Sequence, residues 1–200
     1  MTRPDADPRP TLQPDTPEWD AARERLLNYA FAALSRRALS EAELHTRLQK
    51  RSDQPGLIQH VLDRVKELGY QNDEVVAEGE ARRRGVGAYR VRQKLKQRGL
   101  DEELITEVLE ARDPAAEEED ARQQLARRLP SFARKKNPRA SAYAWLTRRG
   151  YSADLIRRLL DEVAADLPEP ERPARASSFG RTGIGRSKGG HSGRWGRGGS

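Results

Sequence analysis

Two stretches of the sequence carry many cations and no intervening acid, and these cations are the residues best suited to bind an anionic partner. Between positions 81 and 100 the basic residues are Arg82, Arg83, Arg84, Arg90, Arg92, Lys94, Lys96 and Arg98. Between positions 121 and 153 they are Arg122, Arg127, Arg128, Arg134, Lys135, Lys136, Arg139, Arg148 and Arg149. Blocks of one charge indicate a polyanion or an acidic protein surface as the partner.

The acidic residues between these stretches leave a second interpretation open. Positions 101 to 120 hold ten acids against one arginine, Arg112. If these acids pair with the basic stretches inside the fold, most of the charges are structural, and exposed pairs contribute only about 0–1 kcal/mol each. We favour binding, in which two helices present basic faces to a partner. The candidate binding residues are then Arg82, Arg83, Arg84, Arg90, Arg92, Lys94, Lys96, Arg98, Arg134, Lys135, Lys136, Arg139, Arg148 and Arg149.

Three aromatic residues lie among these cations: Tyr89, Tyr143 and Trp145. They could stack on bases or anchor a partner. Single aromatic residues on helices more often belong to the core, and that is the assignment we expect for all three.

The C-terminal tail is a further basic element. From Arg172 onward there are seven basic residues, no acid and nine of the 16 glycines, so the other 31 basic residues balance the chain's 31 acids. With little apolar surface to bury, this tail is expected to be disordered when free. Its Arg–Gly spacing is typical of segments that follow nucleic-acid backbones, although a solubilising tail is the alternative. The candidate DNA-binding residues are Arg181, Arg186, Lys188, Arg194, Trp195 and Arg197.

Several function classes are excluded or disfavoured. The absence of cysteine excludes disulfides, Cys-ligated zinc and a cysteine nucleophile, and the three histidines are scattered. No catalytic triad, phosphate loop or dinucleotide motif occurs, so we expect no enzyme, no cofactor and no metal. The longest apolar run, Tyr29–Leu34, is far shorter than the ~20 residues of a membrane span, and the N-terminus lacks a signal-peptide core. We expect a cytoplasmic monomer.

The elements that position these charges are helices, because apolar residues recur at helical spacing along the body. Ser40, either Asn72 or Asp73, Asp101 and Ser152 are suited to start helices, and Gly69, Gly85, Gly99 and Gly150 to end them. The helices are predicted over residues 18–36, 40–51, 55–68, 73–84, 86–98, 101–112, 114–130, 136–149 and 152–166.

The body also repeats. Segments that begin at Leu48, Leu95 and Leu146 superpose without a gap, at offsets of 47 and 51 residues. Each has an arginine three positions later (Arg51, Arg98 and Arg149) and apolar pairs at positions 9/10 and 13/14. The pattern predicts an all-α, elongated and curved array of three-helix repeats. The predicted domains are a disordered N-terminus at 1–17, repeats at 18–70, 71–113 and 114–167, and a disordered tail at 168–200.

Four segments, in order, resemble the RecX family, whose members regulate the bacterial RecA recombinase. They are Ala33–Leu48, Leu68–Ala77, Gly87–Leu100 and Trp145–Ser152 with the following Leu155–Ile156. The resemblance covers about residues 21–165 and implies nine helices in three repeats. It also implies binding to RecA and to the RecA–DNA filament, with inhibition of ATPase and strand exchange and no catalysis. Gln71, Val75 and Val76 depart from the family pattern, and the tail is not a usual family feature.

A direct nucleic-acid-binding protein, repressor-like or binding single strands, is the alternative function. The basic stretches and the tail would then contact DNA themselves, with RecA incidental. The salt dependence of DNA affinity distinguishes the two hypotheses, because each phosphate contact contributes about one to the log–log slope.

Overall fold

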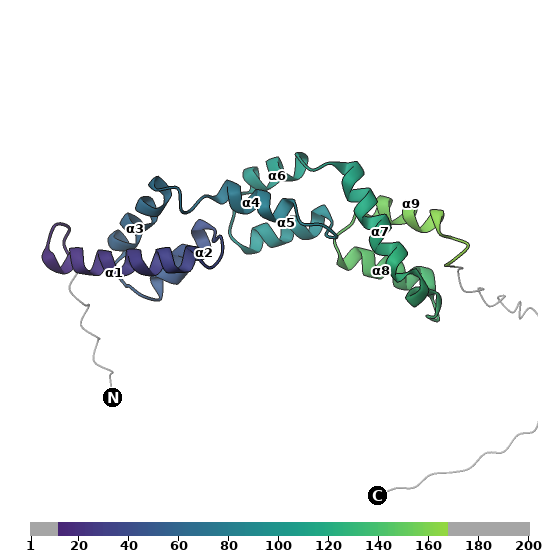
Figure 1. Cartoon of the computed structure of the whole chain (residues 1–200), viewed down its shortest axis with the longest axis horizontal. Helices are drawn as coiled ribbons and strands as arrows, with labels where there is room; N and C mark the ends of the chain where they lie inside the picture. Colours follow the sequence, from purple (N-terminus) through teal and green to yellow (C-terminus); the bar gives the residue numbers. More distant parts are fainter. Residues whose placement is uncertain (1–11, 168–200) are drawn as a thin grey trace, which may run out of the picture. The chain divides into compact units, whose positions relative to one another are not determined.

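The computed structural model describes residues 12–167, which form helices and no strand (Figure 1). The helices are α1 (Pro17–Leu34), α2 (Glu41–Gln49), α3 (Pro55–Glu67), α4 (Asp73–Ala81), α5 (Ala88–Gln97), α6 (Glu102–Glu110), α7 (Pro114–Ala133), α8 (Pro138–Arg148) and α9 (Ala153–Glu162). The all-α prediction is confirmed, and every helix boundary lies within four residues of the predicted one. The six predicted tail residues lie outside the described part of the chain.

Local signals account for these boundaries. Ser40 accepts a hydrogen bond from the backbone N–H of Glu43, whose side chain accepts one from the Ser40 N–H, which is a complete capping box. The four predicted glycine stops all have positive φ, between 69° and 86°. That left-handed conformation is strained for residues with a Cβ. Gly69, Gly99 and Gly150 directly follow the C-caps of α3, α5 and α8, whereas α4 ends at Ala81, four residues before Gly85.

The end of α7 differs from the prediction. A proline normally ends a helix, so the sequence places the end at Pro130, but α7 continues to Ala133. The extra turn carries Phe132, which is buried and lies 5.8 Å from the ring of Trp145. Burial of this aromatic ring in the core favours the last turn more than the missing N–H of Pro130 disfavours it.

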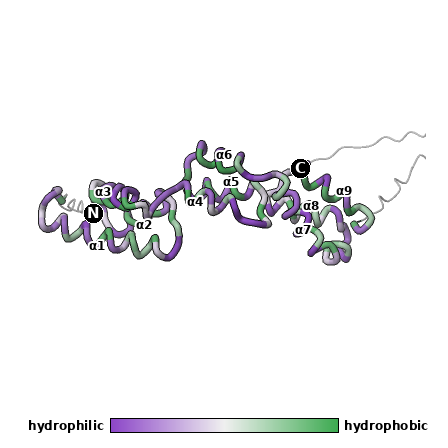
Figure 2. The backbone as a smooth tube through the Cα atoms, turned by 45° about the horizontal axis from the view of Figure 1, so that its top comes forward, coloured by the Kyte–Doolittle hydropathy of each residue, from purple (hydrophilic) through white to green (hydrophobic). Residues whose placement is uncertain are grey.

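Three separate hydrophobic clusters fill the interiors of three successive helix groups. The first contains Trp19, Leu26, Ala30, Ala33, Leu39, Leu44, Leu48, Leu57, Ile58, Val61, Leu62 and Val65. The second contains Val76, Ala77, Ala81, Val91, Leu95, Leu100, Ile105 and Val108. The third contains Ala121, Leu125, Phe132, Ala142, Leu146, Tyr151, Leu155, Ile156, Leu159, Leu160 and Leu167. The alternation of colours along the tube in Figure 2 shows that the helices supplying them are amphipathic.

Packing between helices follows the same grouping. Helix α1 packs on α2 and α3, α4 packs on α5 and α6, and α8 packs on both α7 and α9. We therefore retain the repeat boundaries at 18–70, 71–113 and 114–167 as our proposal. Folded structure begins before residue 18, because the Leu12 N–H donates to Gln54 Oε1 at 3.2 Å and Leu12 packs on the first cluster.

Candidate anion-binding surface

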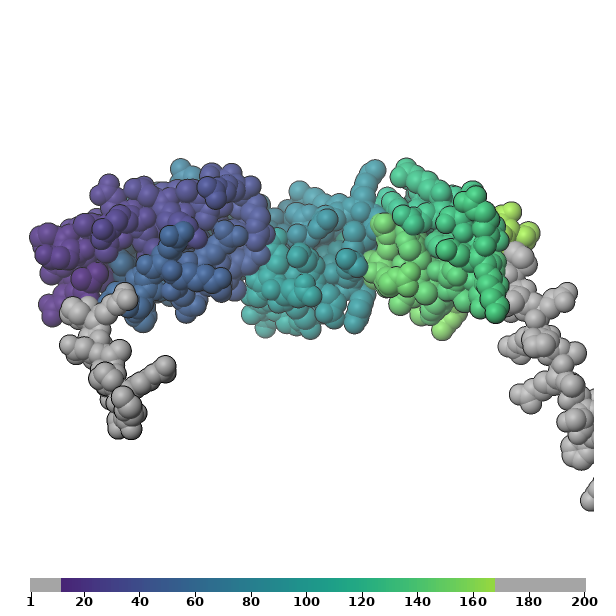
Figure 3. Space-filling model, turned by 90° about the horizontal axis from the view of Figure 1, so that it is seen from below, coloured from purple at the N-terminus to yellow at the C-terminus, as the bar shows by residue number. Residues whose placement is uncertain are grey.

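The C-terminal end of α8 meets the start of α5, and this contact brings the two basic stretches together. The Gly87 N–H, at the start of α5, donates to the Arg149 carbonyl at 2.9 Å, and the Tyr89 N–H donates to the Gly150 carbonyl at 3.1 Å. A Cβ at Gly87 would lie 2.2 Å from the Gly150 oxygen, so only glycine allows this approach. The teal second group and the green third group are in contact in Figure 3.

A groove of about 710 Å³ lies along this junction. Its cations are Arg83, Arg90, Lys94 and Arg148, and its one acid is Glu80. One of these cations also joins the two helices, because Arg90 Nη1 on α5 donates to the backbone carbonyl of Arg148 on α8 at 2.8 Å. The structure therefore gathers in one groove four predicted binding residues that are up to 65 positions apart in the sequence.

Tyr89 lines the groove with 65% of its surface exposed, so its assignment to the core is wrong. The buried face of α5 is formed by Val91 and Leu95, which are one helical turn apart. Tyr89 stands two positions before Val91 and hence on the opposite side of the helix. Tyr143 and Trp145 are partly buried and pack against the third cluster, as the sequence predicts.

Several predicted cations are already neutralised by neighbouring acids. Arg82 pairs with Glu78, Arg83 with Glu80, both Arg92 and Lys96 with Glu102, and Arg139 with Asp161. Hydrogen bonds from Lys96, together with the charge of Arg92, hold the pKa of Glu102 below its ordinary value. Charge pairing, the alternative left open by the sequence, therefore accounts for much of the 82–98 stretch.

Two predicted binding residues serve the fold. Arg98 is only 7% exposed, and its guanidinium contacts Glu43, Glu80 and the Ala38 carbonyl. Arg149 Nη1 donates to the Gly85 carbonyl at 2.8 Å, and its guanidinium lies 4.6 Å from the centre of the Trp145 ring. We therefore leave both residues out of the proposed binding surface.

The remaining predicted cations are exposed and, within residues 12–167, form no ion pair or side-chain hydrogen bond. They are Arg84, Lys94, Arg134, Lys135, Lys136 and Arg148. Arg127 on α7 shares these properties, although it is not among the residues predicted from the sequence. Its position in the acid-free 121–153 stretch is the signal that could have identified it. Because such cations have no competing carboxylate, they are the ones able to attract an anionic partner.

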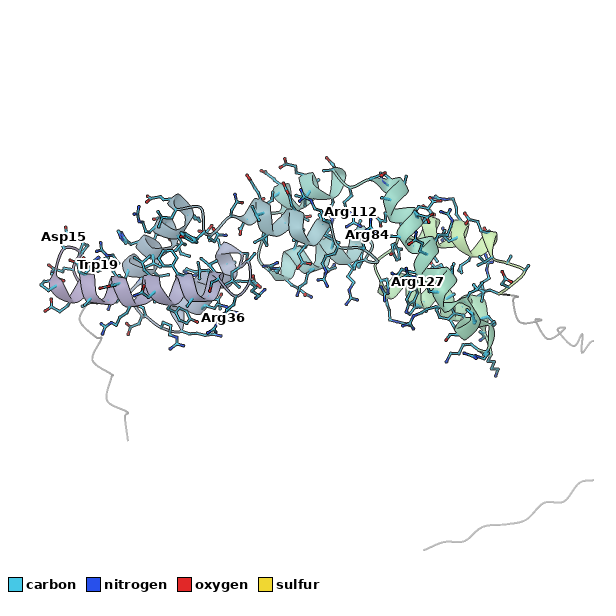
Figure 4. All side chains as sticks on the ribbon, in the orientation of Figure 1. Asp15, Trp19, Arg36, Arg84, Arg112 and Arg127 are labelled. Atoms are coloured by element: carbon cyan, nitrogen blue, oxygen red, sulfur yellow. The ribbon has the colours of Figure 1, made fainter. Side chains whose placement is uncertain are left out.

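Arg112 is a positioning residue that is absent from the predicted set. It donates to the Ala81 carbonyl at 2.5 Å and to the Val86 carbonyl at 3.0 Å, and so spans the loop that carries Arg84. Figure 4 shows Arg84 in the α4–α5 loop, Arg112 in the α6–α7 loop and Arg127 on α7. A single arginine within a block of ten acids is the only sequence signal for this role.

Features of other function classes are scarce in the described residues. No group of three or more His, Asp or Glu side chains between residues 12 and 167 is arranged to hold a metal ion. None of the helices described there is long and apolar enough to cross a membrane.

Comparison with known proteins places the chain in a family. Residues 74–109 match the family model described as RecX, second three-helix domain. The regulatory protein RecX of Deinococcus radiodurans is 52% identical over 167 residues, which are 84% of this chain and 80% of that protein. The regulatory protein RecX of Thermobifida fusca is 36% identical over 150 residues, 69% of this chain and 81% of that protein.

The fold has solved counterparts. The crystal structure of RecX from Lactobacillus salivarius superposes with a TM-score of 0.64 at 16% identity, covering 73% of this chain and 99% of that one. A second structure, of a regulatory protein RecX, gives a TM-score of 0.62 at 18% identity, covering 72% and 74%. From its sequence similarity and its fold, this chain belongs to the RecX family.

Proposed function

We propose that this protein binds the RecA recombinase and its DNA filament, and inhibits ATP hydrolysis, strand exchange and filament growth. Its role is that of a soluble, cytoplasmic, monomeric binding protein in the regulation of recombination, DNA repair and the SOS response, without catalysis of its own. Membership of a family of regulatory proteins supports this role, and the proposed site is the groove between α5 and α8.

The observation that carries the proposal is the set of cations in and near this groove that have no ion-pair partner among residues 12–167. Lys94 and Arg148 line it, and Tyr89 adds an exposed aromatic ring. Cations without carboxylate partners attract an acidic protein surface or DNA phosphates over about one Debye length, which is ~8 Å at physiological salt. The bonds that join α5 to α8 bring Lys94 and Arg148 to one groove, which supports the proposal that this groove faces the partner.

The test is DNA-dependent ATP hydrolysis by RecA with substoichiometric amounts of the protein. We expect inhibition by the wild type and at least tenfold weaker inhibition by the double variant Lys94→Gln/Arg148→Gln, because a tenfold loss corresponds to only about 1.4 kcal/mol. The matched control is Arg36→Gln/Lys50→Gln, which removes two exposed cations of the first helix group that likewise pair with no acid in the described part of the chain. Absence of inhibition by the wild type at any ratio would refute the proposed function. Equal losses in both double variants would refute the proposed site.

Direct DNA binding through the tail is the second candidate, supported by seven cations and no acid after Glu171. If the tail is a DNA tether, truncation after Glu171 should weaken DNA affinity more than it weakens RecA inhibition. The salt slope of DNA binding should also fall by about one for each phosphate that the tail binds. Equal loss of DNA affinity and RecA inhibition would contradict this separation.

A further inference from the structure

The arginine that repeats in the sequence occupies the same place at two junctions between helix groups. Arg98 Nη2 donates to the Ala38 carbonyl at 2.7 Å, two residues before Ser40, the N-cap of α2. Arg149 Nη1 donates to the Gly85 carbonyl at 2.8 Å, two residues before Gly87, the N-cap of α5. In both cases an arginine at the C-terminal end of the second helix of one group binds the segment that leads into the second helix of the preceding group. Arg98 at the end of α5 binds the segment before α2, and Arg149 at the end of α8 binds the segment before α5.

The glycine after each arginine belongs to the same arrangement. A Cβ at Gly99 would lie 2.6 Å from the Ala42 Cβ, and a Cβ at Gly150 would lie 2.4 Å from the Arg90 nitrogen. Any larger residue would push the neighbouring helix start away. Each Arg-Gly pair therefore joins two helix groups. The arginine donates the hydrogen bond across the junction, and the glycine, which lacks a Cβ, allows the neighbouring helix start to approach.

The first copy of the repeat provides an internal control. Arg51 has no preceding helix group to bind, and its guanidinium lies over the Tyr29 ring at 4.7 Å. The next residue is Ser52 and not glycine. The glycine is thus present at the two junctions and absent where the arginine has no junction to make.

The two junctions are held by different forces. At the α2–α5 junction the Arg98 guanidinium contacts the carboxylates of Glu43, at 2.8 Å, and Glu80, at 3.4 Å, and the Ser40 hydroxyl donates to the Arg98 carbonyl. At the α5–α8 junction, backbone bonds join the helices, and no carboxylate in the described part of the chain pairs with Arg149.

We propose that Arg98 and Arg149 are positioning residues that set the spacing of the helix groups, with α2–α5 held by an ion-pair latch and α5–α8 by backbone hydrogen bonds. The proposal deepens the proposed function, on which its consequence for binding rests. Cations on α5 and α8 can contact the same partner at the same time only if the junction keeps the distance between the two helices fixed.

The spacing can be measured directly because the chain has no cysteine to interfere with spin labels. Cysteines replacing Gln49 and Glu103 report on the α2–α5 junction, and cysteines replacing Glu103 and Ala140 report on α5–α8; all three residues are exposed. Arg98→Gln should broaden only the first distance distribution, and Arg149→Gln only the second. Arg98→Lys should not restore the first, because one ammonium group lacks the planar fork that reaches two carboxylates and a carbonyl together.

Controls separate positioning from direct binding and from loss of folding. Arg148→Gln should leave both distance distributions narrow while lowering the salt slope of DNA binding by about one. Arg149→Gln should reduce RecA inhibition with the slope unchanged. If circular dichroism shows that Arg98→Gln loses helicity, the α2–α5 distance is measured in Glu43→Gln instead. This variant removes the negative charge that pairs with Arg98, while the new side-chain amide can still form hydrogen bonds.

Unchanged distances in Arg98→Gln and Arg149→Gln, with a slope lowered by about one in each, would overturn the positioning role and make both residues partner contacts. Unchanged distances in Glu43→Gln would overturn the ion-pair latch. The distances are measured on the full chain without RecA or DNA, so they decide this proposal even if the RecA assay shows no inhibition.

Discussion

Gly87→Ala is the sharpest probe of the α5–α8 junction, because the expected damage is steric and the nearest neighbours are backbone atoms, which cannot rotate aside as a side chain can. The φ of Gly87 is −73°, a value that alanine adopts without strain. The added Cβ would nevertheless lie 2.2 Å from the Gly150 oxygen and 2.4 Å from the Tyr151 nitrogen, both backbone atoms. The helices must therefore separate to admit the methyl group.

The magnitude follows from the bonds that separation weakens. Two backbone hydrogen bonds and two guanidinium–carbonyl bonds join α5 to the end of α8. Neutral hydrogen bonds contribute about 0.5–1.5 kcal/mol net and charged ones about 1.5–3 kcal/mol. Because the parted groups regain water, we expect the free energy of unfolding to fall by about 2–4 kcal/mol, which lies between one overpacked site and loss of all four bonds.

Urea unfolding followed by circular dichroism at 222 nm gives this value, with two controls. Gly87→Ser supplies a good helix cap but the same Cβ, so it should be nearly as destabilised as Gly87→Ala. Gly79→Ala, within α4 and with nothing inside 4 Å of its Cβ, should gain about 0.5–1 kcal/mol from helix propensity. Wild-type stability in Gly87→Ser would refute the steric argument and leave helix capping as the explanation.

Three further substitutions test the core, a buried hydroxyl and the ionic latch. Leu95 is 0% exposed, so Leu95→Ala should lower the free energy of unfolding by about 2–5 kcal/mol, and an unchanged melting temperature would show that the repeat register is wrong. The Tyr151 hydroxyl is buried without a hydrogen-bond partner among the described residues, and burial raises its pKa to about 12. Tyr151→Phe should leave stability unchanged or raise it by up to about 1 kcal/mol in urea unfolding, and a loss greater than that would reveal a partner for the hydroxyl. Burial works to raise the pKa of Glu43, but hydrogen bonds from the Ser40 N–H, Arg98 and Arg37 outweigh it, so the pKa lies below the ordinary 4.5. The ionised Glu43 carboxylate therefore stabilises the fold above pH 4.5, and this stabilisation is lost as the pH falls through its lower folded pKa. The difference in free energy of unfolding between wild type and Glu43→Gln should shrink in acid. A constant difference from pH 7 to pH 3 would contradict the assignment.

The sequence predicts which stretches of the chain supply the candidate site, but it does not predict which individual cations in those stretches remain available to a partner. The two acid-free stretches do supply the groove cations, including Lys94 and Arg148. A run of like charges, however, says nothing about which member meets an acid from another helix. Arg92 and Lys96 share Glu102, whereas Lys94, between them in the sequence, projects without a partner among the described residues. Successive residues on a helix point about 100° apart, so neighbours in sequence face different surroundings.

Helices, most of their ends and the repeat were determined by the sequence itself, whereas the end of α7 depends on the packing of Phe132 against Trp145. The Ser40 capping box, the glycine stops and the spacing of core leucines depend on residues within about four positions of one another, which sequence alone displays. The role of the repeated arginine was decided only by the tertiary structure. Arg98 binds Glu43 across 55 positions, and Arg149 binds the Gly85 carbonyl across 64. Partners so distant meet only when one helix group packs on the next, and this packing separates the arginines that hold the array from the cations that remain available to a partner.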